Sequence, residues 1–237
     1  MRLRTFLRTS LLALAALALA ACGGGSDQTV DPGSTTTLEG AVFKGVTRNA
    51  VVTAWGFNDD GELVELASGT SSANGGFSLT LPAGYRGVIR IVATASQPPA
   101  APTEMRCDAP SGCAVHDNDG NLVDTADFGE WFPVAADFSL RAVATVTLNG
   151  IQMVNLTPLS TLAADWAALY PQGLDASSVL DANTRIAAAF GFQLADLNLP
   201  LHDVTDPLFA GIADSKTLRL SLLMAAFAEV AAQNHVS

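Results

Sequence analysis

Basic residues are scarce in this 237-residue sequence, which contains 12 Lys and Arg against 23 Asp and Glu. Three of the basic residues and none of the acidic ones precede Cys22, so residues 22–237 carry a formal charge of −14. A chain this acidic repels nucleic acid and anionic lipid head groups. We therefore expect no nucleic-acid partner, and any membrane contact should not depend on a basic protein surface.

The sequence also lacks the signatures of common catalytic sites. It contains no Gly-x-Ser-x-Gly elbow, no His-Glu-x-x-His motif, no phosphate-binding loop and no dinucleotide fingerprint. We therefore predict a protein that is not an enzyme and that has no cofactor and no bound metal. The alternative is a hydrolase, or an accessory domain of an envelope hydrolase. A pocket that gathers a histidine with acids or serine would favour this alternative.

The N-terminal apolar run is too short to cross a membrane. Leu11–Ala21 is about half the ~20 residues that a spanning helix needs. Arg2, Arg4 and Arg8 precede this run, and small residues follow it. A basic segment, a short apolar segment and small residues are typical of a secretory signal peptide, which we predict for residues 1–21.

The end of this segment, Leu19-Ala20-Ala21-Cys22, resembles the lipobox of bacterial lipoproteins. The resemblance implies that the Cys22 thiol carries a diacylglycerol, that the chain is cut before Cys22, and that acyl chains such as palmitate anchor it. Gly23 rather than Asp follows the cysteine, which by family analogy implies the outer membrane of the cell envelope. An ordinary signal peptide with an incidental cysteine is the alternative. Residues 22–37 lack aromatic residues and are predicted to be a flexible tether.

Alternating apolar residues begin at Leu38. In "NAVVTAWGF", Val52 and Ala54 should face one side of a strand and Thr53 the other. Asp60-Gly61 and Asn74-Gly75 are typical of hairpin turns. Residues 138–148 are predicted to return to the same body as its last strand. Short strands separated by such turns predict an antiparallel β-sandwich over residues 38–150.

One stretch, "GAVFKGVTRNAVVTAWGFNDDGELVELASGTSSANGGFSLTL", resembles a carboxypeptidase-regulatory-like, or transthyretin-like, β-sandwich. The shared pattern is Gly-x-Val-x-x-Gly, then "NAVVTAW", then "NGGFSL", and it covers roughly residues 38–95. The resemblance implies a sandwich of the kind that serves as a spacer or binding module in surface and secreted proteins. It implies an architecture and leaves the activity open.

Residues 96–137 are predicted to be a long connection that contains the motif "CDAPSGC". If Cys22 is acylated, Cys107 and Cys113 remain as a pair in an exported chain, and we predict a disulfide between them. Five residues separate them, whereas a redox motif has two, and a zinc site would need four ligands. In the following "HDNDGNLVD" we favour a solvated turn, with a calcium loop as the alternative, because Gly120 is misplaced for an EF-type loop.

After residue 150 the apolar period changes to that of helices. Thr157 and Asp175 are predicted N-caps of two helices, and a third should start near Asp214 or Ser215. The expected apolar stripes are Leu159, Leu162, Ala163, Trp166 and Leu169 in the first helix, and Val179, Ala182, Ile186 and Phe190 in the second. The third helix is apolar on most sides, so we expect it to be buried between the other helices and the sheet. The predicted fold class is therefore α+β, a β-sandwich followed by a small helical region at 151–237.

These features predict a lipid-anchored binding, spacer or adhesion-type module of the bacterial cell envelope. Its possible partners are an envelope protein or a glycan. Four of the chain's 16 aromatic residues fall between Phe128 and Phe138, next to the cysteine pair. Binding residues concentrate on loops, and tryptophan is a common interface anchor. We therefore predict that Trp131 and Phe132 form a contact surface, with the alternative that these rings close one end of the sandwich.

Overall fold

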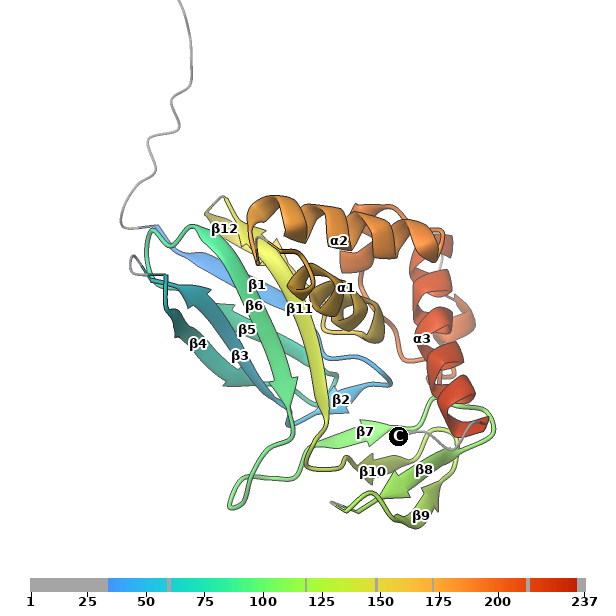
Figure 1. Cartoon of the computed structure of the whole chain (residues 1–237). Helices are drawn as coiled ribbons and strands as arrows, with labels where there is room; N and C mark the ends of the chain where they lie inside the picture. Colours follow the sequence, from blue (N-terminus) through green and yellow to red (C-terminus); the bar gives the residue numbers. More distant parts are fainter. Residues whose placement is uncertain are drawn as a thin grey trace, which may run out of the picture. The chain divides into compact units, whose positions relative to one another are not determined.

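The computed structural model describes residues 34–58, 61–117, 119–147, 149–171, 173–211 and 214–233 (Figure 1). The predicted signal peptide, Cys22 and most of the predicted tether lie outside the described residues. The strands are β1 (Thr36–Ala41), β2 (Thr47–Arg48), β3 (Val51–Phe57), β4 (Leu63–Thr70), β5 (Gly76–Thr80), β6 (Gly87–Thr94), β7 (Glu104–Arg106), β8 (Cys113–His116), β9 (Leu122–Ala126), β10 (Trp131–Pro133), β11 (Ser139–Val146) and β12 (Gly150–Met153). The helices are α1 (Pro158–Ala168), α2 (Ala176–Ala189) and α3 (Ser215–Gln233), with short 3-10 turns η1 (Leu194–Asn198) and η2 (Phe209–Gly211).

Two sheets share one apolar core, and the fold class is α+β with mainly antiparallel sheets and three helices. The first sheet has the order β11-β6-β3-β4 and the second has the order β12-β1-β5. The alternation predicted for β3 is confirmed, because Val52 and Ala54 are fully buried and Thr53 is not. Alternating residues of β1, β5, β6 and β11 join them in one cluster, which we call the sandwich core: Leu38, Val42, Ala50, Val52, Ala54, Phe77, Leu79, Leu81, Ile89, Ile91, Ala93, Leu140, Ala142, Val146, Val154 and Leu156.

The strand predicted for residues 138–148 is present as β11, which pairs antiparallel with β6 from Ser139↔Thr94 to Val146↔Gly87. The hairpin predicted at Asn74-Gly75 is wrong. The turn there leads from β4 into β5, and these strands belong to different sheets. The Ser71 hydroxyl accepts a hydrogen bond from Ala50 N (2.9 Å) and donates one to Thr47 O (2.8 Å), which fixes the chain at the end of β4. The next strand, β5, then pairs with β1.

The segment predicted as a connection, residues 96–137, contains four further strands. β7 pairs with β2 and β10 to form a small sheet, and β8 pairs with β9. The disulfide between Cys107 and Cys113 joins the end of β7 to the start of β8, as predicted. In Figure 1 these strands lie at the lower end of the sandwich.

Helices α1 and α2 lie side by side on β11, at one edge of the first sheet (Figure 1). Both predicted N-caps are confirmed as capping boxes. Ser160 N donates to the Thr157 hydroxyl at 3.1 Å, and Ser178 N donates to the Asp175 carboxylate at 2.7 Å. Val179 and Ala182 of the second predicted stripe are buried against Val143 of β11.

The stripe predicted for α1 is partly wrong. Leu162, Trp166 and Leu169 are 43%, 47% and 79% exposed, and the buried face consists of Leu159, Ser160, Ala163, Ala164 and Ala167. The polar start of the helix explains this rotation. The Ser160 hydroxyl donates to Arg141 O at 2.7 Å, and the Thr161 hydroxyl accepts from Arg141 N at 2.9 Å. Small alanines then face β11, because they allow a close approach of helix and strand.

The helix α3 packs against β8 and η1 on one face only. Leu220 and Met224 are buried, whereas Leu222 and Val230 are 53% and 57% exposed. The expectation that α3 would be buried on most sides is therefore wrong, because α3 packs against β8 and η1, while α1 and α2 are the helices that pack on β11. Among the described helices, none is both long and apolar enough to cross a membrane.

Candidate ligand-binding site

The predicted contact residues Trp131 and Phe132 belong to β10, and they lie in different environments. The Trp131 ring is half-buried and lies beneath two guanidinium groups, with Arg48 Cζ 4.2 Å and Arg106 Cζ 5.8 Å from its centroid. Arg48 is also paired with Glu104 of β7 at 2.7 Å. Trp131 therefore contributes to the small sheet while part of its ring stays exposed, and its role as a contact residue stays a prediction.

The exposure expected for Phe132 is wrong, because this side chain is 7% exposed. It packs with Cys107, Val115 and Ala228 in a cluster that joins β10 to the disulfide and to α3. Consecutive residues of a strand point to opposite faces, so a strand at this place can expose only one of the two rings. Phe132 nevertheless contributes to a cavity.

A cavity of about 500 Å³ lies between the small strands, the start of β11 and α1, and the last turns of α3. Its walls are mainly apolar. The lining residues are Lys44, Met105, Asp108, Cys113, Ala114, His116, Phe132, Pro133, Val134, Ala135, Asp137, Phe138, Ser139, Leu140, Pro158, Thr161, Leu162, Phe227, Ala228, Ala231 and Ala232. Buried lining residues such as Asp108, Phe132 and Leu140 mark its floor, and the exposed Pro133, Asp137 and Leu162 mark its rim.

The floor of the cavity contains a buried carboxyl group. Asp108 follows the disulfide cysteine Cys107 directly and is 3% exposed. Its Oδ2 atom is buried and makes no hydrogen bond to the described part of the chain. Burial raises the pKa of Asp108 to about 7; its own backbone N–H and Lys44 oppose the shift, and the nearby Asp203 adds to it. A carboxyl group in such a position takes up and releases a proton near neutral pH, which is a property of functional sites.

Lys44 is the second charged group of the inner wall. Lys44 lies in the tight turn between Phe43 and Val46, which form an antiparallel bridge, and it lines the cavity together with Asp108. Burial lowers the pKa of the Lys44 ammonium, and the negative charge of Asp108 opposes this shift. No salt bridge within 4.0 Å involves Lys44 among the described residues.

Gly45 allows the two segments to approach. Its φ of +101° lies in the left-handed region, and a Cβ atom there would lie 2.0 Å from Arg106 O. The same Cβ would lie 3.5 Å from the Asp108 carboxyl carbon. Only glycine fits, so the turn after β1 can bring Lys44 close to the disulfide loop.

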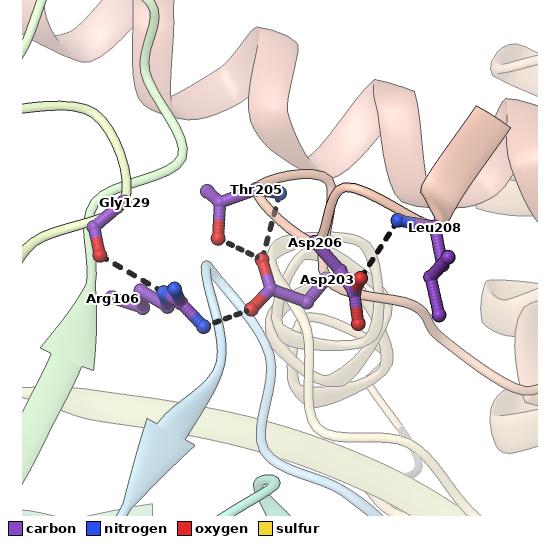
Figure 2. A network of polar contacts seen from close by, with 6 residues as sticks. All are labelled: Arg106, Gly129, Asp203, Thr205, Asp206 and Leu208. Carbon is purple, nitrogen blue, oxygen red and sulfur yellow. Dashed lines mark hydrogen bonds and ion pairs between the residues drawn. The ribbon is translucent and has the colours of Figure 1, made fainter.

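A network of polar contacts fixes the strand that precedes Asp108 (Figure 2). Arg106 Nε donates to Gly129 O, and its Nη1 pairs with Asp203 Oδ2, both at 2.9 Å. The other Asp203 oxygen accepts from the Thr205 backbone (2.8 Å) and hydroxyl (2.6 Å). Figure 2 shows Arg106 between the β9–β10 turn and the segment that leads to α3. This network therefore ties two separate segments to the end of β7, next to the cavity floor.

The residues that line the cavity also include His116, Asp137 and Ser139, the residue types whose grouping would favour a hydrolase. In the described part of the chain no hydrogen bond joins His116 to Ser139 or to Asp137. A nucleophile and its general base should lie within hydrogen-bond reach of each other. The residues are thus gathered without the contacts that would activate the serine.

The turn after β8 shows how the acids of "HDNDGNLVD" are used. The Asp117 carboxylate accepts hydrogen bonds from the backbone N–H groups of Asp119 (2.9 Å) and Asn121 (2.8 Å). These bonds and those from the Asn121 amide lower the pKa of Asp117. Across residues 34–233, apart from the few that are not described, no three His, Cys, Asp or Glu side chains lie close enough to hold a metal ion.

Sequence reasoning missed Lys44 and Asp108. Lys44 lies within the Gly-x-Val-x-x-Gly pattern and Asp108 within "CDAPSGC", but neither pattern assigns these side chains a role, and 64 positions separate them. The one feature of the sequence that could have indicated burial of Asp108 is its position directly after a cysteine of the predicted disulfide. The disulfide was found because cysteine pairing in an exported chain depends on composition, not on the tertiary fold.

No protein-family model and no curated protein sequence matches this chain. A crystal structure of a 9R-lipoxygenase from Cyanothece PCC8801 aligns with 54% of this chain and 17% of the lipoxygenase chain. The sequence identity is 14% and the TM-score is 0.23. A likeness this weak supports no conclusion about fold or activity.

Proposed function

We propose that this chain is a non-enzymatic binding module of the bacterial cell envelope, anchored by acyl chains on Cys22, with its ligand site in the cavity. The anchor is supported by the sequence Leu19-Ala20-Ala21-Cys22 and by the basic, then apolar, segment before it. Gly23 supports the outer membrane as the location. The tether would leave the folded part near the membrane surface, where an envelope protein or a glycan can also reach it.

The observation that carries the binding role is the cavity. Its volume of about 500 Å³ lies within the range of about 300–1,000 Å³ that is typical of small-molecule sites. Such sites have apolar walls and a few polar groups that orient the ligand. Here the apolar walls include Met105, Phe132 and Phe227, and the polar groups of the inner wall are Lys44 and Asp108.

We also propose that the sandwich is of the transthyretin-like kind. The pattern that supports this proposal, from Gly40 to Leu81, spans β1 to β5 and supplies strands to both sheets. In such a module the strands form a scaffold, and the inserted strands β7 to β10 build the site at one end. An experimental structure would test this assignment through the order of strands in the two sheets.

Binding to the cavity can be tested with a neutral apolar dye, N-phenyl-1-naphthylamine, and the mature chain carrying Cys22→Ser. Dye fluorescence should rise on binding to this protein. Ala231→Trp places a large ring among the lining residues and should weaken binding at least about tenfold, because the ring occupies the volume of the ligand. Leu222→Trp, on the exposed face of the same helix, is the matched control and should bind as before. Equal binding by both tryptophan variants would contradict a ligand site in the cavity.

The anchor can be tested separately. Cys22→Ala should release the protein from membranes or leave an uncut precursor, because no thiol remains to be acylated. Mass analysis of the N-terminal peptide of the native protein should show the acyl chains. A Cys22→Ala variant that fractionates with membranes as the native chain does would contradict the anchor.

The second candidate function is a hydrolase, which the presence of His116, Asp137 and Ser139 in the lining of one cavity favours. Its test is hydrolysis of p-nitrophenyl butyrate by the native chain. Ser139→Ala should abolish turnover if this function is correct, with Ser111→Ala as a control because Ser111 is an exposed serine bonded to Glu229. The binding module predicts no turnover above the rate in buffer.

A further inference from the structure

The chemistry of the cavity floor restricts the ligand that the proposed function requires. The Asp108 carboxyl group is withdrawn from solvent, and its Oδ2 atom has no hydrogen-bond partner in the described part of the chain. The Lys44 ammonium lines the same cavity, interacts electrostatically with Asp108 and has no salt bridge among the described residues. A buried polar atom without a partner is unfavourable, so a ligand that supplies the missing hydrogen bonds gains affinity.

The charges of Lys44 and Asp108 indicate which polar group a ligand should carry. Burial favours the neutral, protonated form of Asp108, whose O–H then donates a hydrogen bond. Lys44 also only donates, so the two groups together require an acceptor. A carboxylate accepts from both, and its single negative charge neutralises the ammonium. An amine offers a second positive charge beside Lys44, and a phosphate brings more negative charge than one lysine neutralises, in a region where Asp203 already interacts with Asp108.

The rest of the cavity indicates the chemistry of the part of the ligand outside its polar head group. Outside the Lys44–Asp108 pair, the inner walls consist of side chains such as Phe132, Leu140 and Ala228. The exposed Leu162 continues this apolar surface at the rim. Trp166 follows Leu162 one turn further along α1 on the same side of the helix.

We propose that the cavity binds an apolar monocarboxylic acid, with its carboxylate between Lys44 and Asp108 and its apolar chain directed toward Leu162. This proposal rests on the proposed binding function and adds the class of ligand. The head group lies at the floor, and the chain lies between β10 and α3. An acid longer than the cavity would extend over the exposed face of α1.

The test compares three ligands of equal chain length on the mature chain carrying Cys22→Ser. Decanoate, 1-decanol and decylamine displace the neutral dye, and their affinities are obtained at pH 7. Decanoate should bind at least about tenfold more tightly than the other two, because it alone forms a charge-assisted contact with Lys44. Lys44→Gln should remove this advantage and leave the affinity for 1-decanol unchanged. Arg185→Gln, which removes an exposed guanidinium of α2, should change neither affinity.

Asp108→Asn provides a second measurement. The asparagine amide still donates to a carboxylate, so decanoate should keep its affinity within about threefold of the native value. Decylamine binding as tight as that of decanoate, or loss of decanoate binding in Asp108→Asn, would overturn the proposed ligand class while cavity binding stands. Failure of the dye and all three ligands to bind would overturn the proposed function as well.

Discussion

The sandwich core and the cavity region are both interiors of this protein, but they are filled in different ways. The sandwich core is built from aliphatic and aromatic side chains of two sheets, and Val52, Ala54 and Ile91 in it are fully buried. The cavity region contains empty volume, a buried carboxyl group and a disulfide. The sandwich thus stabilises the fold through close packing, whereas the other end gives up packing to create a site.

The largest expected effect lies in the sandwich core. Ile91 is in β6, between β3 and β11, and it is 0% exposed. Ile91→Ala should lower the free energy of unfolding by about 2–5 kcal/mol, because it removes buried methyl groups and leaves a void that the sheets cannot close. Urea unfolding measures the loss. A loss below about 1 kcal/mol would show that this core is loosely packed and would remove the contrast with the cavity region.

In the cavity region we expect a substitution to stabilise the protein, because it removes a buried ionisable group. The pKa of Asp108 is raised from 3.8 to about 7 in the folded protein, so the folded state binds the proton more tightly than the unfolded state. Stability should therefore fall as the pH rises from about 4 to about 7 and then level off. Asp108→Asn removes this loss, and at pH 8 the variant should be more stable than the native chain by about 2–4 kcal/mol.

Urea unfolding of both proteins at pH 4.5 and pH 8 checks this difference. At pH 4.5 the difference should shrink to about 1 kcal/mol, because folded Asp108 is then protonated while the unfolded group, with a pKa of 3.8, is already mostly ionised. An Asp108→Asn variant that loses stability equally at both pH values would show that the carboxylate is needed for structure.

The disulfide should contribute an intermediate amount. Cys107 and Cys113 are six positions apart, and a loop this short restricts the unfolded chain only modestly, which corresponds to about 2–2.5 kcal/mol. The double variant Cys107→Ala, Cys113→Ala should lose this amount in thermal or urea unfolding. It should also weaken dye binding, since Cys113 lines the cavity. A variant with unchanged stability and unchanged binding would mean that neighbouring contacts alone hold this loop.

The sequence predicts features that depend on residues close together in the chain, and it misses those that depend on distant ones. The strands β3, β5 and β11 and the caps Thr157 and Asp175 depend on local alternation and on residues three positions apart, and they were predicted. The strand β12 was missed because it is short and largely exposed, with Ile151 at 69% exposure, and because its parallel pairing with β1 spans more than 100 residues. Such pairing leaves no local pattern.

The candidate site depends almost entirely on long-range placement. Lys44, Asp108 and residues of α3 such as Ala228 come from distant parts of the sequence and line the same cavity. Aromatic clustering pointed to the correct segment, because Phe132 lines the cavity. It could not show which ring faces inward, since that depends on the register of β10 with β7.

Overpacking compares the two interiors directly. Ala54→Leu adds three carbon atoms to the closed sandwich core and should cost about 1–3 kcal/mol. Ala228→Leu adds the same atoms to α3 beside the cavity, where there is space, and should leave stability within about 0.5 kcal/mol of the native value. Thermal unfolding of both variants gives the comparison. Equal destabilisation by the two variants would contradict the presence of usable space beside Ala228.

The smallest effect is expected on the exposed face of α1, where the apolar pattern was misleading. Trp166 is 47% exposed, while Leu159 of the same helix is 1% exposed and belongs to a buried cluster. Trp166→Ser should change the free energy of unfolding by no more than about 0.5 kcal/mol, whereas Leu159→Ala should cost about 2–5 kcal/mol. The hydrogen bonds of Ser160 and Thr161 with Arg141 fix the rotation of the helix, so the tryptophan remains outside whatever its hydrophobicity. If Trp166→Ser proves as destabilising as Leu159→Ala, the helix is rotated toward the face that its apolar pattern predicts, and the apolar rim of the cavity at Leu162 is lost with it.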